Sequence, residues 1–249
     1  MNSTVILKGN ILYTPRPSEF ISIQHGYIIA VDGVVVYCGE SIPPAYEDCE
    51  ITDYGDNLII PGFVDTHAHA PQYCNRGLGM DKELLPWLET YTFPEEAKFS
   101  DLDYARLVYG AFVQDLWRNG TTRSILFGTI HKESTLVLME LLQKAGLSAY
   151  VGKVNMDRNS PDFLIEETSQ SLADTKEWLE ASASFGPLVK PIITPRFVPS
   201  CTSELMDGLG TLSEAYNVPV QSHLSENHGE IDWVASLHPE SPNYTDVYY

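Results

Sequence analysis

The sequence predicts an α/β fold in which parallel strands alternate with crossover helices, preceded by a small β unit. From residue 101 onward, apolar runs of strand length alternate with segments of helix length, which indicates βα units and a parallel sheet. Before residue 58, short β-branched runs are separated by glycines, a pattern typical of strands and tight turns. We therefore predict a small β-sandwich-like segment over residues 1–57 and a (β/α) domain over residues 58–249.

The N-terminal segment contains four candidate strands. They are Thr4–Leu7, Phe20–Ile23, Tyr27–Ala30 and Val34–Tyr37, with glycines at positions 9, 26, 33 and 39. Glycine adopts the backbone conformations that tight turns require. The segment is therefore expected to form a compact β unit of its own.

The second part contains five candidate strands, each followed by a helix. The strands begin at Leu58, Ser124, Ala149, Val189 and Val218, and the helices are expected over residues 101–117, 132–144, 166–183, 202–216 and about 229–237. Gly120 and Gly146 follow the first two of these helices, where glycine favours a C-terminal cap. Residues 70–100, rich in aromatics and prolines, are long enough to suggest a functional loop.

The number of strands leaves the closure of the sheet open. A closed barrel of this type needs eight strands, whereas the chain offers five. Two interpretations remain: an open sheet, or a barrel whose last three units are absent from this chain.

Composition excludes several classes of protein. The 249 residues include 15 Lys and Arg against 34 Asp and Glu, a formal net charge of −19, which argues against binding to a phosphate backbone. No apolar run approaches a membrane span, and the N-terminus lacks a signal-peptide pattern. The four cysteines show no Cys-x-x-Cys spacing, as expected in a reducing compartment. We expect a cytoplasmic protein with neither nucleic acid nor membrane as partner.

Two candidate strands end in histidine and predict a metal site. His67 and His69 are two residues apart, so a strand directs both rings to the same side. His223 ends the run that starts at Val218, and three histidines plus water make an open catalytic zinc site. Glu226 lies three residues further and can take and return protons. A His-x-His pair can also be simply hydrogen-bonded or solvated, but strand ends are where α/β barrels place their chemistry.

Several motifs resemble those of a known family. Residues 61–69 resemble the first-strand signature of the metal-dependent amidohydrolase superfamily, and further blocks narrow the resemblance to the guanine deaminases. These blocks are residues 69–73, 84–95, 119–122, 151–157, 190–197 and 221–227. The resemblance thus covers nearly the whole chain.

The resemblance implies a TIM-like (β/α)8 barrel, with one Zn²⁺ per chain, that hydrolyses guanine to xanthine and ammonia. In such an enzyme the zinc ligands match His67, His69 and His223, and Glu226 matches the residue that shuttles protons. The residues that match contacts to guanine are Gln72 and Arg196 at its edge and Leu84, Trp87 and Phe197 as apolar wall and lid. The full-length form is expected to be a homodimer. Without the resemblance, Arg196 reads as a surface residue, Gln72 as a loop amide and Trp87 as core.

The chain departs from the family at its end. Family members continue past the position of Tyr249, and their later strands supply a further histidine and a metal-binding aspartate that have no counterpart here. We therefore expect a form truncated after about five βα units. Two alternatives remain: an inactive shortened paralogue that acts by protein pairing, and an amidohydrolase for another aminated heterocycle.

Overall fold

The computed structural model describes residues 3–248. The chain forms two compact units, Met1–Gly62 and Phe63–Tyr249. The second unit contains every predicted site residue, and the first is described on its own below. Among residues 3–248, no helix is both long and apolar enough to cross a membrane.

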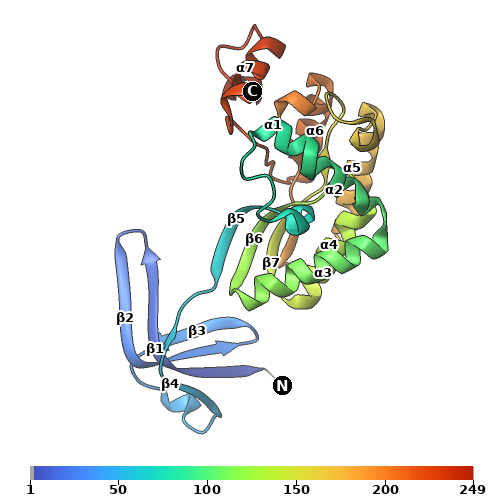
Figure 1. The fold of residues 1–249 in the computed structure, drawn as a ribbon. Coiled ribbons are helices and arrows are strands. Elements are labelled where there is room, and N and C mark those ends of the chain that lie inside the picture. The colour runs from blue at the N-terminus through green and yellow to red at the C-terminus, as the bar shows by residue number, and fades with distance from the viewer. Residues whose placement is uncertain (1–2, 249) are drawn as a thin grey trace. The chain divides into compact units, whose positions relative to one another are not determined.

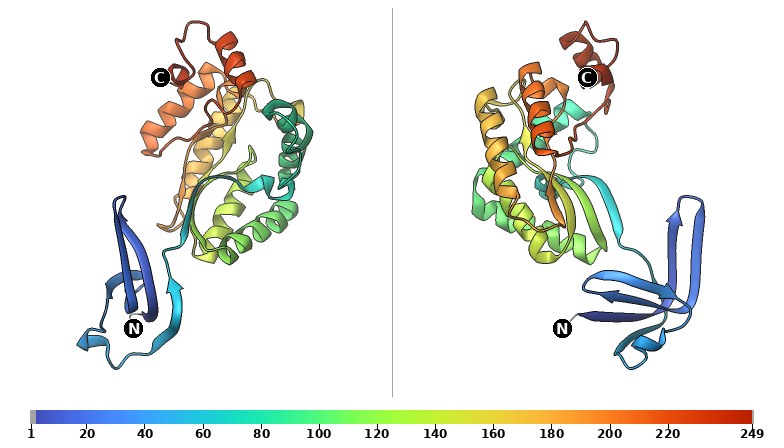
Figure 2. Two further views of the ribbon diagram at one scale, coloured as in Figure 1. Left: turned by 60° about the vertical axis from the view of Figure 1, so that its left-hand side comes forward. Right: turned by 180° about the vertical axis from the view of Figure 1, so that it is seen from behind.

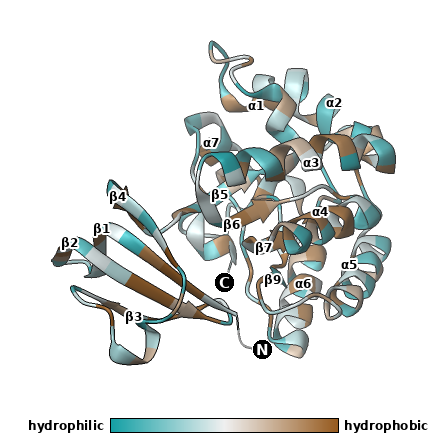
Figure 3. Ribbon diagram, turned by 90° about the horizontal axis from the view of Figure 1, so that it is seen from below, coloured by the Kyte–Doolittle hydropathy of each residue, from teal (hydrophilic) through white to brown (hydrophobic). Residues whose placement is uncertain are grey.

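The first unit is a four-stranded sheet with the strand order β3-β2-β1-β4. Its strands are β1 (Thr4–Arg16), β2 (Glu19–Val31), β3 (Val34–Gly39) and β4 (Ile51–Ile59). Strand β1 pairs antiparallel with β2 and parallel with β4, and β2 pairs antiparallel with β3. Figure 3 shows apolar residues along these strands, and Ile6, Ile11 and Ile29 are the buried ones among residues 3–62. The unit therefore has only a small core.

Three sequence-based expectations for this region need correction. The runs predicted as separate strands at 20–23 and 27–30 belong to one strand, β2, which passes through His25 at φ 51°. Residues 3–62 form one sheet rather than a sandwich. The strand expected from Leu58 starts instead at Phe63, because Leu58 belongs to β4 and Pro61, which lacks an N–H, cannot continue a ladder.

The second unit is built on a parallel sheet with the order β5-β6-β7-β9. Its strands are β5 (Phe63–His69), β6 (Thr121–Phe127), β7 (Ser148–Gly152) and β9 (Val189–Pro191), and the short strands β8 (Val154–Asn155) and β10 (Thr194–Pro195) pair beyond it. Every pair in the sheet is parallel. This confirms the predicted α/β fold with a parallel sheet.

Helices connect the strands and cover the outer side of the sheet (Figures 1 and 2). They are α3 (Leu102–Arg118), α4 (Lys132–Ala145), α5 (Thr168–Ser182) and α6 (Ser203–Tyr216), with α7 (His228–Leu237) after the last extended segment. The five helices lie where the sequence predicted them, with ends shifted by one or two residues. The main core lies between strands and helices and includes Tyr109, Leu126, Leu138, Val151, Trp178 and Leu205.

The helix ends follow from local chemistry. The side chain of Asp101 accepts hydrogen bonds from the first turn of α3, and Thr202 does the same for α6, which satisfies backbone donors that the helix leaves free. Helix α4 ends at Gly146, whose φ of 69° is left-handed. This conformation is easy for glycine and costly for other residues.

Two further segments differ from the sequence-based expectation. Residues 70–100, expected as a loop, consist largely of short helical turns that include α1 (Leu84–Trp87), a π-helical turn (Leu88–Thr92) and α2 (Phe93–Glu96). The strand predicted from Val218 is reduced to a single parallel bridge between Val220 and Ile193. Pro219 lies inside this run and has no N–H to donate, so only a short ladder can form.

We predict opposite effects of one substitution at two glycines. A methyl group at Gly146 or at Gly110, in the middle of α3, would meet no atom within 4 Å. Gly146→Ala should lower the free energy of unfolding by about 1 kcal/mol because alanine resists the left-handed conformation. Gly110→Ala should raise it by about 0.5–1 kcal/mol because alanine favours a helix. Urea unfolding of both variants checks the pair, and a shift of equal sign would contradict it.

Candidate functional site

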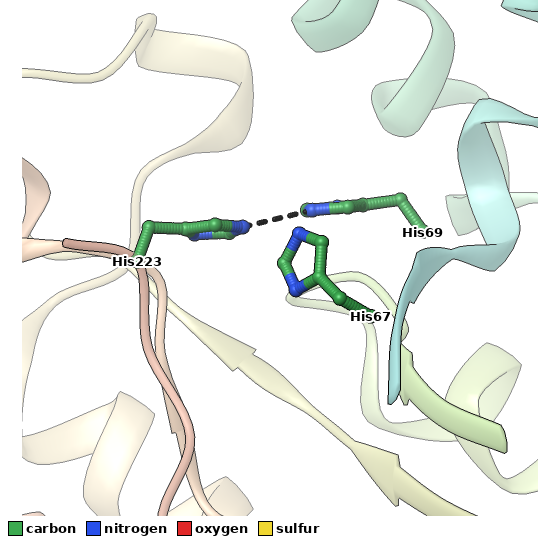
Figure 4. Close-up of side chains that lie close together, drawn as sticks. All are labelled: His67, His69 and His223. Carbon is green, nitrogen blue, oxygen red and sulfur yellow. Dashed lines mark hydrogen bonds between the residues drawn. The ribbon is translucent and has the colours of Figure 1, made fainter. Parts of the chain in front are cut away.

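Two segments far apart in sequence bring three histidines together. His67 and His69 come from the C-terminal end of β5, where their spacing of two places both rings on one side. His223 lies three residues past the Val220 bridge, and its backbone N–H donates to the Arg196 carbonyl at 3.2 Å. One ring nitrogen from each histidine lies within 4.8 Å of the others. Figure 4 shows ring nitrogens of His69 and His223 pointing toward each other, with His67 beside them.

The protonation of these rings suits a metal ion. The Nδ1 atom of His223 lies 2.6 Å from the Arg196 carbonyl oxygen, and because a carbonyl only accepts, Nδ1 carries the proton and Nε2 keeps its lone pair. Burial and the charge of Arg196 lower the pKa of His223 to about 3 and that of His69 well below its usual value. Neutral imidazoles are the form that binds metals.

The contact between the two rings supports the same interpretation. The Nε2 atoms of His69 and His223 lie 2.9 Å apart, and the buried Nδ1 atom of His69 has no partner among the described residues. Two nitrogen lone pairs at that distance repel each other unless a proton or a cation lies between them. With a proton on Nε2 of His69 the contact is a hydrogen bond. With both nitrogens unprotonated, the two lone pairs and the His67 ring nitrogen lie where one divalent cation can bind.

A cavity of about 200 Å³ adjoins the histidines. Its lining consists of His67, His69, Gln72, Leu84, Trp87, Leu88, Arg196, Phe197, His223 and Glu226. The structure thus brings together every site residue that the sequence analysis named, and adds Leu88. Leu84, Trp87 and Leu88 come from the helical turns after residue 83, opposite the strand ends that carry Arg196 and Phe197.

The polar wall of the cavity is a buried hydrogen-bonded group. Arg196 is 2 % exposed, so it is not the surface arginine of the simplest interpretation. Its Nη1 and Nη2 atoms donate to the two carboxylate oxygens of Glu96 at 2.6 and 3.1 Å. The amide nitrogen of Gln72 donates to the same carboxylate at 3.3 Å. Glu96 therefore connects Arg196 and Gln72, the two candidate residues for contacts to the edge of a substrate.

Glu226 lies beside His223, in the loop that precedes α7. Its Oε1 atom lies 3.8 Å from Nε2 of His223 and its side chain is 38 % exposed. Burial and the neighbouring charge of Glu230 raise the pKa of Glu226. The carboxylate of Glu230 accepts the backbone N–H of Glu226 at 2.7 Å and the hydroxyl of Tyr244 at 2.6 Å. Glu230 therefore holds the backbone that carries Glu226.

Sequence reasoning missed Glu96, Leu88 and Glu230. A signal for Glu230 exists, because Asn227 and Glu230 form the capping box of α7. No spacing points to Glu96, since its partner Arg196 lies 100 residues away. Leu88 follows Trp87 directly in the sequence. Both side chains line the same cavity only because this segment is helical.

Comparison with known proteins gives consistent similarities. The model of the amidohydrolase family matches residues 58–249. A guanine deaminase of Dictyostelium discoideum is 53 % identical over 203 residues, which cover 81 % of this chain and 45 % of that protein. The guanine deaminase of Escherichia coli K12 is 40 % identical over 94 % of this chain and 55 % of its own length. The chain thus spans about half the length of these curated relatives.

Solved structures show the same similarity. A guanine deaminase from C. acetobutylicum with guanine bound in its active site superposes with a TM-score of 0.96 at 53 % identity, over 99 % of this chain and 59 % of that one. An atrazine chlorohydrolase mutant from Arthrobacter aurescens TC1, complexed with zinc and atraton, has a TM-score of 0.82 at 13 % identity, over 98 % of this chain and 57 % of that one. The second similarity shows a shared fold alone.

We predict that Glu230 stabilises the segment that carries Glu226. Glu230→Gln replaces one acceptor oxygen by an amino group, so at least one buried donor loses its partner. The free energy of unfolding should fall by about 1–3 kcal/mol. Asp232→Asn, an exposed change on the same helix, is the matched control and should change it by less than about 0.5 kcal/mol. Equal effects of the two changes in urea unfolding would contradict this role.

Proposed function

The chain belongs to the amidohydrolase family, and on that basis we propose that it acts in the zinc-dependent hydrolysis of guanine to xanthine and ammonia. The observation that carries the proposal is the cavity that combines three histidines, a carboxylate and a donor-rich polar wall. Support comes from the relatives above, which are guanine deaminases, one of them with guanine bound.

We assign one zinc ion to His67, His69 and His223. Three imidazoles leave a coordination position open for water, as catalytic zinc sites require. When bound, zinc supplies a Lewis acid that makes water acidic enough to react near neutral pH. The hydrogen bond from Nδ1 of His223 to the Arg196 carbonyl orients one of these ligands, as outer partners of zinc-binding histidines do.

The other lining residues suit a small flat heterocycle. Arg196 can only donate hydrogen bonds and so recognises a ring carbonyl or ring nitrogen, whereas Gln72 offers an amide. Trp87, Leu84 and Phe197 provide aromatic and aliphatic surfaces for the faces of the ring. A cavity of about 200 Å³ suits a free base better than a nucleotide. Guanine combines a carbonyl, ring nitrogens and an amino group that hydrolysis can release.

Glu226 is the proton carrier of this proposal. Its carboxylate lies beside the histidines and is only partly solvated. In the proposed reaction it accepts a proton from the attacking water and passes that proton to a purine ring nitrogen. It then carries the second proton, from the newly formed hydroxyl group to the amino group, which leaves as ammonia while the ring carbonyl forms. General acid and base catalysis of this kind contributes about 10²–10⁴ in rate.

We predict guanine deaminase activity that depends on Glu226. Protein purified with zinc should convert guanine to xanthine with equimolar release of ammonia. Glu226→Gln should lower kcat by about 10²–10⁴ because the amide cannot carry the proton. The control Glu133→Gln changes an exposed glutamate of α4 that does not line the cavity and should leave kcat unchanged. Ammonia release from melamine but not from guanine would instead support the alternative of another aminated heterocycle.

We also predict one equivalent of zinc that depends on the histidine cluster. Zinc measured by plasma emission should reach about one per chain. His69→Ala should lower zinc affinity by more than about 100-fold, which exceeds the effect of losing a residue that only hydrogen-bonds a metal ligand. His25→Ala, an exposed histidine of the first unit, is the control and should bind zinc normally. Retention of full zinc by His69→Ala would overturn the ligand assignment.

A further inference from the structure

The carboxylate of Glu96 lies behind the polar wall of the cavity. Glu96 is 1 % exposed and does not line the cavity, yet it bonds two residues that do, Arg196 and Gln72. We infer that Glu96 is a positioning residue that fixes both side chains for recognition of the substrate edge. This inference rests on the proposed function, since the edge to be read is that of guanine.

The contact with Arg196 is a two-point contact. Both terminal nitrogens of the guanidinium donate to Glu96, one to each oxygen. Such a pair fixes the plane of the guanidinium as well as its place. The ring of Phe93, on the same helix α2, lies 5.1 Å from the Arg196 Cζ atom and adds a second restraint. The donors of Arg196 that remain free therefore keep one direction.

The contact with Gln72 fixes the orientation of an amide. A carboxylate only accepts hydrogen bonds, so the amide must turn its nitrogen toward Glu96, and Oε1 of Glu96 accepts from both Gln72 and Arg196. The carbonyl oxygen of Gln72 is then the atom left for a ligand. The polar wall of the cavity therefore offers a ligand one acceptor, from Gln72, and donors, from Arg196, at fixed positions. Without Glu96, the amide is free to turn over.

Charge gives Glu96 a second effect on recognition. Arg196 is 2 % exposed, and a buried cation requires a partner. Glu96 supplies the neutralising charge, so the wall as a whole is neutral, as a neutral base requires. Among residues 3–248, Glu96 is the only acidic residue within 4 Å of the Arg196 guanidinium nitrogens.

The neighbouring Glu95 provides a matched control. It lies on the same short helix and is 6 % exposed, but its carboxylate bonds Lys98 at 2.6 Å and the hydroxyl of Tyr104. Neither partner lines the cavity. Glu95→Gln and Glu96→Gln therefore remove the same charge from the same helix, and one of them leaves the cavity wall intact.

The test compares steady-state kinetics of the zinc-loaded protein and these two variants. Glu96→Gln should raise KM for guanine by about 10- to 100-fold, the range for a lost hydrogen bond to a charged group, with a smaller fall in kcat. Glu95→Gln should leave KM unchanged. A role limited to stability would instead lower the active fraction and the melting temperature in both variants without changing KM.

A second measurement follows the guanidinium itself. In the wild type, the bidentate pair should slow rotation of the Arg196 Nη groups, so that their ¹⁵N-correlated proton signals are resolved. Glu96→Gln should merge these signals, whereas Glu95→Gln should not. If Glu96→Gln fails to fold, Glu96→Asp replaces it: the charge is kept, the shorter side chain cannot reach both partners, and KM should again rise.

The outcomes separate this inference from the proposed function. Guanine turnover by the wild type with an unchanged KM in Glu96→Gln would overturn the inference and leave the function standing. Absence of guanine turnover and binding in the wild type would overturn the function, and with it the recognition role of Glu96. A raised KM together with merged Arg196 signals would support both.

Discussion

The parallel alignment of the strands is the constraint on which the site depends. In a parallel sheet all C-terminal strand ends meet at one edge, and the register pairs His69 with Phe127 and Phe127 with Gly152. At this edge the space is narrow: a Cβ atom on Gly152 would lie 1.8 Å from Oγ1 of Thr194. The absence of a side chain at residue 152 therefore lets the next segment, and with it Arg196, approach the histidines.

The electrostatics of the site depend on the same alignment. The carbonyl of Arg196 accepts from His223 while the guanidinium of Arg196 pairs with Glu96. One residue therefore sets the tautomer of a candidate metal ligand with its backbone and forms the polar wall with its side chain. Burial, and after it the positive charge of Arg196, lowers the pKa of His69 and of His223. In the proposed function, metal binding and recognition of the substrate edge are therefore coupled through this residue.

Much of the fold and of the site could be predicted from the sequence, because the signals are local. Alternating apolar runs indicated the parallel sheet, capping residues such as Asp101 and Gly146 located helix ends, and the His67-x-His69 spacing implied convergence. The missed features depend on contacts between distant segments. The bridge at Val220 is short because Pro219 limits its ladder, and residues 84–96 are helical because they pack against Phe197 and other apolar residues of the strand ends. Only the contact with Arg196 in the structure identifies Glu96 as part of the site.

The long sequence separation of the Glu96–Arg196 pair has a consequence for folding. The two partners are 100 positions apart in the sequence, and three crossover helices, α3, α4 and α5, lie within that interval. Closing so long a loop costs chain entropy, and the contacts of a largely formed sheet are needed to offset this cost. We therefore expect the cavity to form late in folding. A ligand of the cavity binds only the folded second unit and therefore shifts the folding equilibrium toward it. The fraction of chains with a ligand bound would then indicate how many of them have all their βα units folded.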